Sequence, residues 1–254
     1  MNNLLRNKDF YDCIAPEYDE MISFDESVVR KKKSLSSLIK PEMRKAADLG
    51  CGTGVDSIAL VSMGIEVTAF DPSVEMLSVA RKNAKNTNVN LDFHNSSVDN
   101  IPENFNNKFD LAVALGNTFA NIPREKFASS IKRCFEILKD DGKLVIQILN
   151  YEKIISEKKR IVNIKEGEKN YFIRFYDLVG DEIIFNILSF TKSNPGYNKL
   201  ISTPILAYST DDFSRELKSC GFNSTNFYSD FELSEFDRMQ SKDLIIVSKK
   251  LRIQ

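Results

Sequence analysis

The sequence predicts an α/β fold: a doubly wound, mostly parallel sheet with a small inserted antiparallel β lobe. Three observations predict it. Short apolar runs alternate with amphipathic stretches between about residues 45 and 149, a pattern typical of alternating strands and helices. A glycine-rich loop follows the first apolar run. Aromatic and β-branched residues are frequent between residues 171 and 191, as expected for antiparallel strands.

The first half of the chain supplies the parallel sheet. Apolar residues at helical spacing predict helices over residues 55–63, 74–85 and 126–138. Each helix follows one strand and precedes another, which places helices on both faces of the sheet. The apolar runs predict strands over residues 46–49, 66–70, 91–93, 109–115 and 143–149.

Beyond residue 150 the pattern changes. Residues 171–179 and 182–191 predict two strands, and Gly180-Asp181 between them suits a hairpin turn. A helix over residues 211–219 has Ser209 or Thr210 as its N-cap and Gly221 as its stop, and residues 244–248 predict a last strand. We therefore divide the chain into an N-terminal helical segment (1–44), an α/β core (45–150), an inserted β lobe (151–208) and a C-terminal helix with strands that complete the core (209–254).

Composition is that of an ordinary soluble globular protein. The chain has 254 residues, 42% hydrophobic and 28% charged, which suits one α/β domain with a modest insertion. Its formal net charge of -1 argues against a surface that neutralises many phosphates, so we do not expect a nucleic-acid partner. The basic run from Arg30 to Lys33 is either a solvated helix face or a contact for an acidic ligand.

Cysteine usage and hydropathy bear on the compartment. The four cysteines show no CxxC or CxxH spacing, which indicates reduced thiols and no metal site. The N-terminus lacks the apolar core of a signal peptide, and no segment approaches the roughly 20 apolar residues that span a bilayer. We expect a cytoplasmic protein without a membrane partner. The cysteines are Cys13, Cys51, Cys134 and Cys220.

The loop after the first strand is the most informative segment. Gly50, Gly52 and Gly54 alternate there, and glycine is needed where the backbone takes positive φ or a ligand approaches without meeting a Cβ. A dinucleotide-binding loop would need Gly-x-Gly-x-x-Gly, but Val55 stands at the last glycine position. Asp48 before the glycines would repel a pyrophosphate and suits an ammonium and a sulfonium. The alternative is that the glycines serve only a tight turn.

The segment from Asp48 to Gly54, Asp-Leu-Gly-Cys-Gly-Thr-Gly, resembles motif I of the class I S-adenosylmethionine-dependent methyltransferases. The similarity in the order of elements extends from about Tyr11 to the C-terminus. It implies a Rossmann-like, seven-stranded sheet, S-adenosylmethionine as cofactor and S-adenosylhomocysteine as product. The cofactor-binding residues that it implies are Asp48, Gly50, Cys51, Gly52, Gly54, Asp71, Pro72, Met76, Ser97, Val98, Leu115 and Gly116.

Two of these implied contacts concern the nucleoside. Asp71 ends the second strand, where the family has an acidic residue that accepts hydrogen bonds from both ribose hydroxyls; the alternative is a plain helix cap. Many members have an acidic residue at the position of Ser97, so the adenine contact departs from the pattern. The Ser97 hydroxyl and the Val98 N–H still suit an adenine edge. Whether Ser97 or Asp99 contacts adenine stays open.

The fourth strand and its exit bear on the acceptor. Residues 115–121, Leu-Gly-Asn-Thr-Phe-Ala-Asn, are similar to a segment of the glycine N-methyltransferases, and so are residues 150–154. No Asn/Asp-Pro-Pro-Tyr/Phe follows the strand, which argues against DNA, ribosomal RNA and protein glutamine as acceptors. The resemblance implies a small-molecule acceptor, an amine above all. It also implies that the Leu115 backbone holds the methionine end of the cofactor and that Asn117 faces the acceptor; alternatively, Asn117 caps the next helix.

Acceptor recognition departs from the glycine enzymes, in which an arginine of the inserted sheet clamps the substrate carboxylate. Residues 205–207, just before Tyr208, contain no arginine, so glycine itself is not supported. Arg174 shares a strand face with Phe172 and Tyr176, which is either the cleft face or the solvent face. The segment with Tyr11 and Tyr18 resembles the N-terminal segment that closes over the site in many relatives, which implies that residues 1–44 form a lid. The two tyrosines then line the acceptor cavity; the alternative is that one of them belongs to the core.

The predicted reaction is an in-line displacement that needs orientation more than acid–base help, and we assign no general base. Asn117, Tyr18 and Arg174 are the candidate acceptor-positioning residues. Two alternatives remain. One is a methyltransferase acting on RNA or protein, which the near-neutral charge disfavours; the other is a noncatalytic cofactor-binding module.

Overall fold

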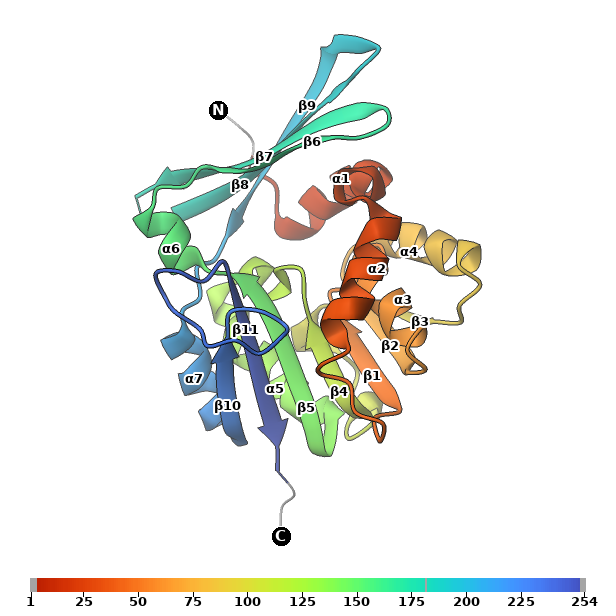
Figure 1. Cartoon of the computed structure of the whole chain (residues 1–254), viewed down its shortest axis with the longest axis vertical. Coiled ribbons are helices and arrows are strands. Elements are labelled where there is room, and N and C mark those ends of the chain that lie inside the picture. Colours follow the sequence, from red (N-terminus) through yellow and green to blue (C-terminus); the bar gives the residue numbers. More distant parts are fainter. Residues whose placement is uncertain (1–3, 181, 252–254) are drawn as a thin grey trace.

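The computed structural model describes residues 4–180 and 182–251. Seven strands form sheet A, in the order β10-β11-β5-β4-β1-β2-β3, and four strands form sheet B, in the order β6-β7-β8-β9. Sheet B lies over one end of sheet A (Figure 1). The predicted fold class, a mostly parallel sheet with an antiparallel β lobe, is confirmed. Within the described ranges, no helix has both the length and the apolar character needed to cross a membrane.

Five strands of sheet A are parallel, and β11 runs antiparallel to both β5 and β10. The short apolar runs therefore became the strands that the sequence predicts. Strand β5 is longer than the predicted 143–149, because the chain passes from a helix directly into the strand and turns at Asp141, where φ is 65°. The strands of sheet A are β1 (Lys45–Leu49), β2 (Glu66–Asp71), β3 (Asp92–Asn95), β4 (Phe109–Ala114), β5 (Leu138–Leu149), β10 (Phe222–Tyr228) and β11 (Asp243–Lys250).

Helices cover both faces of sheet A. Phe127 of α5 packs with Ala112 on one face, while Leu60 of α3 packs with Val113 on the other. Ala112 and Val113 are neighbours in β4, so the alternation of a strand explains the two cores. Helix α7 begins with a capping box in which Ser209 accepts from the Asp212 N–H, which decides between the two predicted caps. These helices are α2 (Phe24–Leu35), α3 (Val55–Val61), α4 (Val74–Asn86), α5 (Arg124–Ile137) and α7 (Thr210–Ser219), with 3₁₀ turns η1 (Val98–Asn100), η2 (Glu103–Phe105) and η3 (Thr118–Asn121).

Sheet B is the inserted lobe. Its central strands are the two that the sequence predicts, and β6 and β9 flank them. Gly180 has a φ of 60°, as a hairpin turn requires; Asp181, the other residue of that predicted turn, lies outside the described residues, as do residues 1–3 and 252–254. The strands are β6 (Ile161–Glu166), β7 (Asn170–Val179), β8 (Glu182–Thr191) and β9 (Asn194–Ile205), and α6 (Tyr151–Ser156) precedes them.

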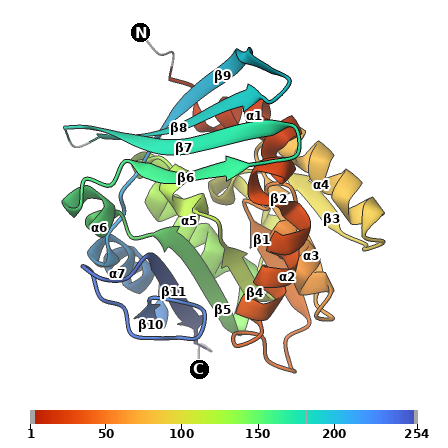
Figure 2. The same cartoon turned by 45° about the horizontal axis from the view of Figure 1, so that its top comes forward.

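Helix α1 (Asn7–Ile22) lies behind the strands of sheet B in Figure 2, and it packs against that sheet and against α4. Its Phe10 and Ile14 pack with Phe172 and Ile187 of sheet B. The segment before α1 is tied to β9, since the Leu5 N–H donates to the Ser202 carbonyl at 2.9 Å. The N-terminal segment therefore bridges the β lobe and the parallel sheet. The four predicted segment boundaries stay a prediction.

Candidate cofactor and acceptor sites

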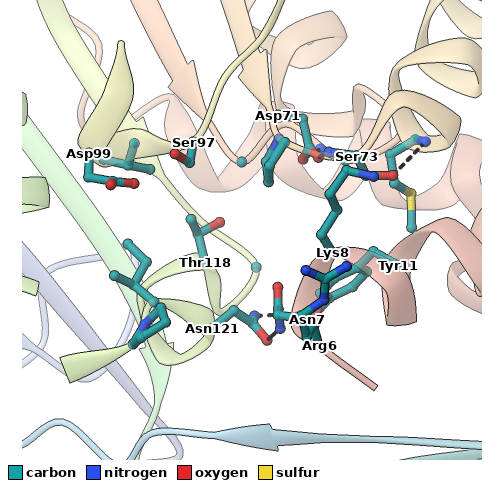
Figure 3. A pocket seen from close by; sticks show the side chains of 18 of the residues that line it. Arg6, Asn7, Lys8, Tyr11, Asp71, Ser73, Ser97, Asp99, Thr118 and Asn121 are labelled. Atoms are coloured by element: carbon teal, nitrogen blue, oxygen red, sulfur yellow. Dashed lines mark hydrogen bonds between the residues drawn. The ribbon is translucent and has the colours of Figure 1, made fainter. Parts of the chain in front are cut away.

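A first cavity of about 360 Å³ lies where β1, β2 and β4 end. Its volume falls in the usual range for small-molecule sites, about 300–1,000 Å³. In Figure 3, Asp71 and Ser97 lie on one side of it, and Tyr11 and Asn121 lie on the other. An open α/β sheet binds its ligands at this edge, because the loops that follow the strands meet there.

The glycine loop forms part of this cavity. Gly50 has a φ of 76°, and its N–H donates to the Phe70 carbonyl at 2.7 Å, which binds the loop to the end of β2. A Cβ on Gly50 would lie 2.5 Å from the Thr118 hydroxyl oxygen. A Cβ on Gly52, where φ is 54°, would meet no atom within 4 Å. The loop therefore needs glycine at both positions. Gly50 allows close packing against Thr118, and Gly52 allows a left-handed backbone beside open space.

Asp71 is held at the cavity wall by two backbone groups. The Gly52 N–H donates to its Oδ2 at 2.8 Å, and the Ser73 N–H donates to its Oδ1 at 2.8 Å. Only 7% of the side chain is exposed. Burial raises the pKa of this carboxyl to about 6, and the two N–H groups oppose that shift. Each carboxylate oxygen keeps a lone pair that a hydroxyl donor can reach.

The loop after β3 lines the cavity with Ser97, Val98 and Asp99. Asp99 is paired with Lys126 at 2.9 Å. Both polar candidates for an adenine contact therefore reach the cavity, and the choice between them stays open. Arg133, which the sequence analysis missed, fastens the next turn by donating to the Ile101 and Pro102 carbonyls, each at 2.7 Å. The sequence offered one signal for this role: Arg133 stands among the residues that form the buried face of α5.

Four of the predicted cofactor residues do not line the cavity: Asp48, Cys51, Gly54 and Leu115. Asp48 is 1% exposed and accepts a hydrogen bond from the Ser57 hydroxyl at 2.5 Å. Burial, with the nearby Asp56 carboxylate, raises the pKa of Asp48 well above its ordinary value. Its side chain therefore supports the loop from behind, and the predicted contact with an ammonium stays a prediction.

A second cavity, of about 320 Å³, adjoins the first. The two cavities share Tyr11, Tyr18, Gly116 and Asn121. The other walls come mainly from the end of β5, from the four strands of the lobe and from Lys242. All three predicted acceptor residues, Asn117, Tyr18 and Arg174, line this second cavity. The structure thus brings together residues from both sheets and from α1.

Known proteins resemble this chain in sequence and in fold. A family model described as a methyltransferase domain matches residues 46–142. The rabbit (Oryctolagus cuniculus) glycine N-methyltransferase is 32% identical over 127 residues, 44% of this chain and 43% of that protein, so the chain matches about half the length of such relatives. The putative methyltransferase YqeM of Bacillus subtilis is 27% identical over 94% of this chain and 97% of its own. An S-adenosylmethionine-dependent methyltransferase structure from Clostridium acetobutylicum superposes with a TM-score of 0.73 at 18% identity, covering 95% of this chain and 99% of that one.

The family model, the relatives and the fold together support a class I S-adenosylmethionine-dependent methyltransferase. The first cavity fits the cofactor of that family. Cβ atoms on Gly52 and Gly116 would meet nothing within 4 Å, which leaves room for a ligand against the backbone. Asp71 offers a carboxylate to a pair of hydroxyl donors, as a ribose has. Of the twelve predicted cofactor residues, the cavity-lining ones are Gly50, Gly52, Asp71, Pro72, Met76, Ser97, Val98 and Gly116.

Arg174 faces the second cavity. Its Nε donates to the Asn163 amide oxygen at 2.7 Å, and it forms no ion pair with any residue in the described ranges. The cavity lining also contains Lys242 and, in the described part of the chain, no Asp or Glu. A half-buried guanidinium without a counterion favours an anionic ligand, because its remaining donors otherwise lose the hydrogen bonds of water.

Asn117 lines the second cavity with its amide already engaged. Its Nδ2 donates to the Tyr151 hydroxyl, and its Oδ1 accepts from the Leu149 N–H at 3.0 Å. Asn117 therefore holds Tyr151 and the end of β5 in place, and its contact with an acceptor stays a prediction.

Two further polar residues escaped the sequence analysis. Asn121 donates to the Tyr11 hydroxyl at 3.2 Å and to the Asn117 carbonyl at 2.9 Å. Gln147 accepts from the Gly116 N–H at 2.8 Å and so positions the loop after β4. Asn121 stands in the segment that resembles the glycine N-methyltransferases, which was a usable signal. Gln147 lies inside a strand and gave none.

Proposed function

We propose that the chain transfers a methyl group from S-adenosylmethionine to the amine nitrogen of a small molecule that also carries an anionic group. One observation carries the proposal: a cavity with two cations opens onto the cofactor cavity through four shared residues. Such a junction lets an acceptor meet the cofactor while its anionic group lies at Arg174. The similarity to a glycine N-methyltransferase supports nitrogen as the methylated atom.

Orientation is the chain's main contribution to this reaction. S-adenosylmethionine, when bound, supplies a methyl group on a positively charged sulfur that is already a good leaving group. Holding two reactants in line recovers about 7–11 kcal/mol of a barrier. Tyr11, Tyr18 and Asn121 form the junction between the cavities, and Asn121 donates a hydrogen bond to the Tyr11 hydroxyl there. A closed junction also excludes water.

Proton transfer requires little from the protein. The described lining of the second cavity contains no carboxylate and no histidine. His94 lies on β3, pairs with Asp92 at 2.8 Å and stacks on Phe70. An acceptor amine therefore enters the cavity deprotonated. Its nitrogen would form the new C–N bond as the S–C bond breaks and the sulfur takes that electron pair. The methylated ammonium would then release a proton to solvent.

The cofactor is tested first, by calorimetry with S-adenosylmethionine and with NADH. We expect the sulfonium compound alone to bind and Asp71→Ala to abolish that binding, because the variant removes the carboxylate at the cavity wall. Primary amines that carry a carboxylate or a phosphate are then screened for methyl acceptance. Absence of S-adenosylmethionine binding to folded protein would overturn the proposal. Binding without transfer to any acceptor would indicate a cofactor-binding module instead.

Arg174→Gln tests acceptor recognition. We expect KM for the acceptor to rise by about 10–100-fold with little change in cofactor affinity, since a hydrogen bond to a charged group contributes about 1.5–3 kcal/mol. Arg44→Gln, at an exposed position before β1, is the matched control and should change neither constant. An unchanged KM in Arg174→Gln would remove the anionic group from the proposal.

A further inference from the structure

A third cavity, of about 280 Å³, lies between α6 and β6. It shares Leu149, Val162, Tyr176 and Lys242 with the second cavity. The three cavities therefore follow one another, from the cofactor cavity through the acceptor cavity to this third space, which we call the vestibule.

The inner part of the vestibule is apolar and rigid. Ile154 is 9% exposed, and Tyr176, on the side of the acceptor cavity, is 3% exposed. The Tyr176 ring packs 5.7 Å from the Phe185 ring and 6.2 Å from the ring of the buried Tyr151, measured between centroids. Val162 and Leu149 complete the apolar lining. A surface of this kind favours an apolar chain over a polar one.

The outer part of the vestibule is basic. Three lysines and one acidic residue, Glu157, line it. Lys153 is engaged, because its amino group donates to the Gln240 carbonyl at 2.6 Å and lies 3.8 Å from Glu157. Lys159 and Lys242 are exposed, and neither side chain forms a hydrogen bond or an ion pair in the part of the chain that the structure describes, although Lys242 lies near enough to the Asp243 carboxylate to interact with it electrostatically. In a protein of net charge -1, two unpaired cations beside an apolar cavity point to an anionic group on the ligand.

We propose that the vestibule binds the far end of the acceptor: an apolar chain that ends in a second anionic group beside Lys242 and Lys159. This inference rests on the proposed function, because it places the amine at the junction with the cofactor cavity and the first anionic group at Arg174. The acceptor class is then an amino acid with a long apolar side chain that ends in an acid, rather than a small amino acid such as glycine.

Two compounds of equal length test this inference. 2-Aminosuberate ends in a carboxylate and 2-aminooctanoate ends in a methyl group. Each is titrated by calorimetry into the full chain saturated with S-adenosylhomocysteine. We expect 2-aminosuberate to bind about fivefold more tightly, which is the upper end for a solvent-exposed ion pair. Lys159→Met combined with Lys242→Met should abolish the preference, because methionine keeps an apolar stem without the charge.

Lys82→Met, on an exposed face of α4, is the matched control and should keep the preference. Equal affinities of the two compounds for the wild type would overturn the inference, and so would failure of both to bind. A preference that survives in the double variant would overturn it as well. The affinity for S-adenosylhomocysteine, measured in the same samples, separates the two proposals. If the protein does not bind S-adenosylhomocysteine, the proposed function is contradicted. If it binds S-adenosylhomocysteine but does not prefer 2-aminosuberate, only the vestibule is contradicted.

Discussion

The cofactor cavity and the acceptor cavity are built in different ways. Apart from residues of α1, Met76 of α4 and Lys126 of α5, the first is lined by the ends of parallel strands and the short loops that follow them, and backbone N–H groups and glycines shape it. The second is lined mainly by side chains from α1, β5 and all four strands of sheet B, and by Lys242. A backbone-built site is encoded within a few consecutive residues, whereas a side-chain-built site depends on segments far apart in the chain. The cofactor half should therefore respond to changes of backbone conformation, and the acceptor half to changes of charge and shape.

Gly50→Ala should have the largest effect of the three changes that test this comparison. Its Cβ would lie 2.5 Å from the Thr118 hydroxyl oxygen at a φ of 76°. The left-handed conformation alone costs about 1–2 kcal/mol for a residue with a Cβ, and the contact displaces the loop as well. We expect S-adenosylmethionine affinity, measured by calorimetry, to fall by about 100-fold.

Gly180→Ala is the matched control for that change. Gly180 has a φ of 60° but open space around its Cβ position, and it lies in the hairpin of the lobe. Gly180→Ala should lower the thermal unfolding temperature, because alanine is also strained in a left-handed conformation. It should leave the cofactor affinity unchanged. If both variants bound the cofactor like the wild type, the glycine loop would be a turn without a role in binding.

The second-largest expected effect is a decrease in cofactor affinity at low pH, caused by protonation of Asp71. Burial raises the pKa of Asp71 to about 6, and hydroxyl donors prefer the ionised form. The fraction of ionised Asp71 falls as pH decreases through 6, so the affinity should fall about tenfold between pH 7 and pH 5. Asp71→Asn should bind weakly with no such dependence. A wild-type affinity that is constant over this range would show that Asp71 does not accept the ribose hydroxyls.

The same contrast explains what the sequence alone could predict. The glycine loop was recognisable from its own residues, and Asp71, Ser97 and Val98 were implied by the family resemblance at the ends of strands that local patterns predict. Lys242 reaches the acceptor cavity only through tertiary contacts, so no local pattern identified its role.

Two other differences have local physical causes. Asp48 was expected to face the ligand, but its carboxylate turns toward Ser57 behind the loop and does not line the cavity. Strand β9 was missed because its first half is polar and exposed, so residues 194–200 show little apolar periodicity. Its buried second half gains its partners from β8 and from the segment before α1, which no local pattern predicts.

Tyr11→Phe gives the smallest expected effect and tests where the two cavities meet. Tyr11 lines both, and its hydroxyl accepts from Asn121 at 3.2 Å. The variant keeps the ring and loses one hydrogen bond of about 1 kcal/mol, so cofactor affinity and the acceptor KM should each worsen by up to about fivefold. Tyr197→Phe, at a position 72% exposed on β9, should change neither. Gly50→Ala should change mainly the cofactor affinity, and Arg174→Gln mainly the acceptor KM. If Tyr11→Phe also changed only one of these two constants, Tyr11 would belong to a single cavity, which contradicts the shared junction.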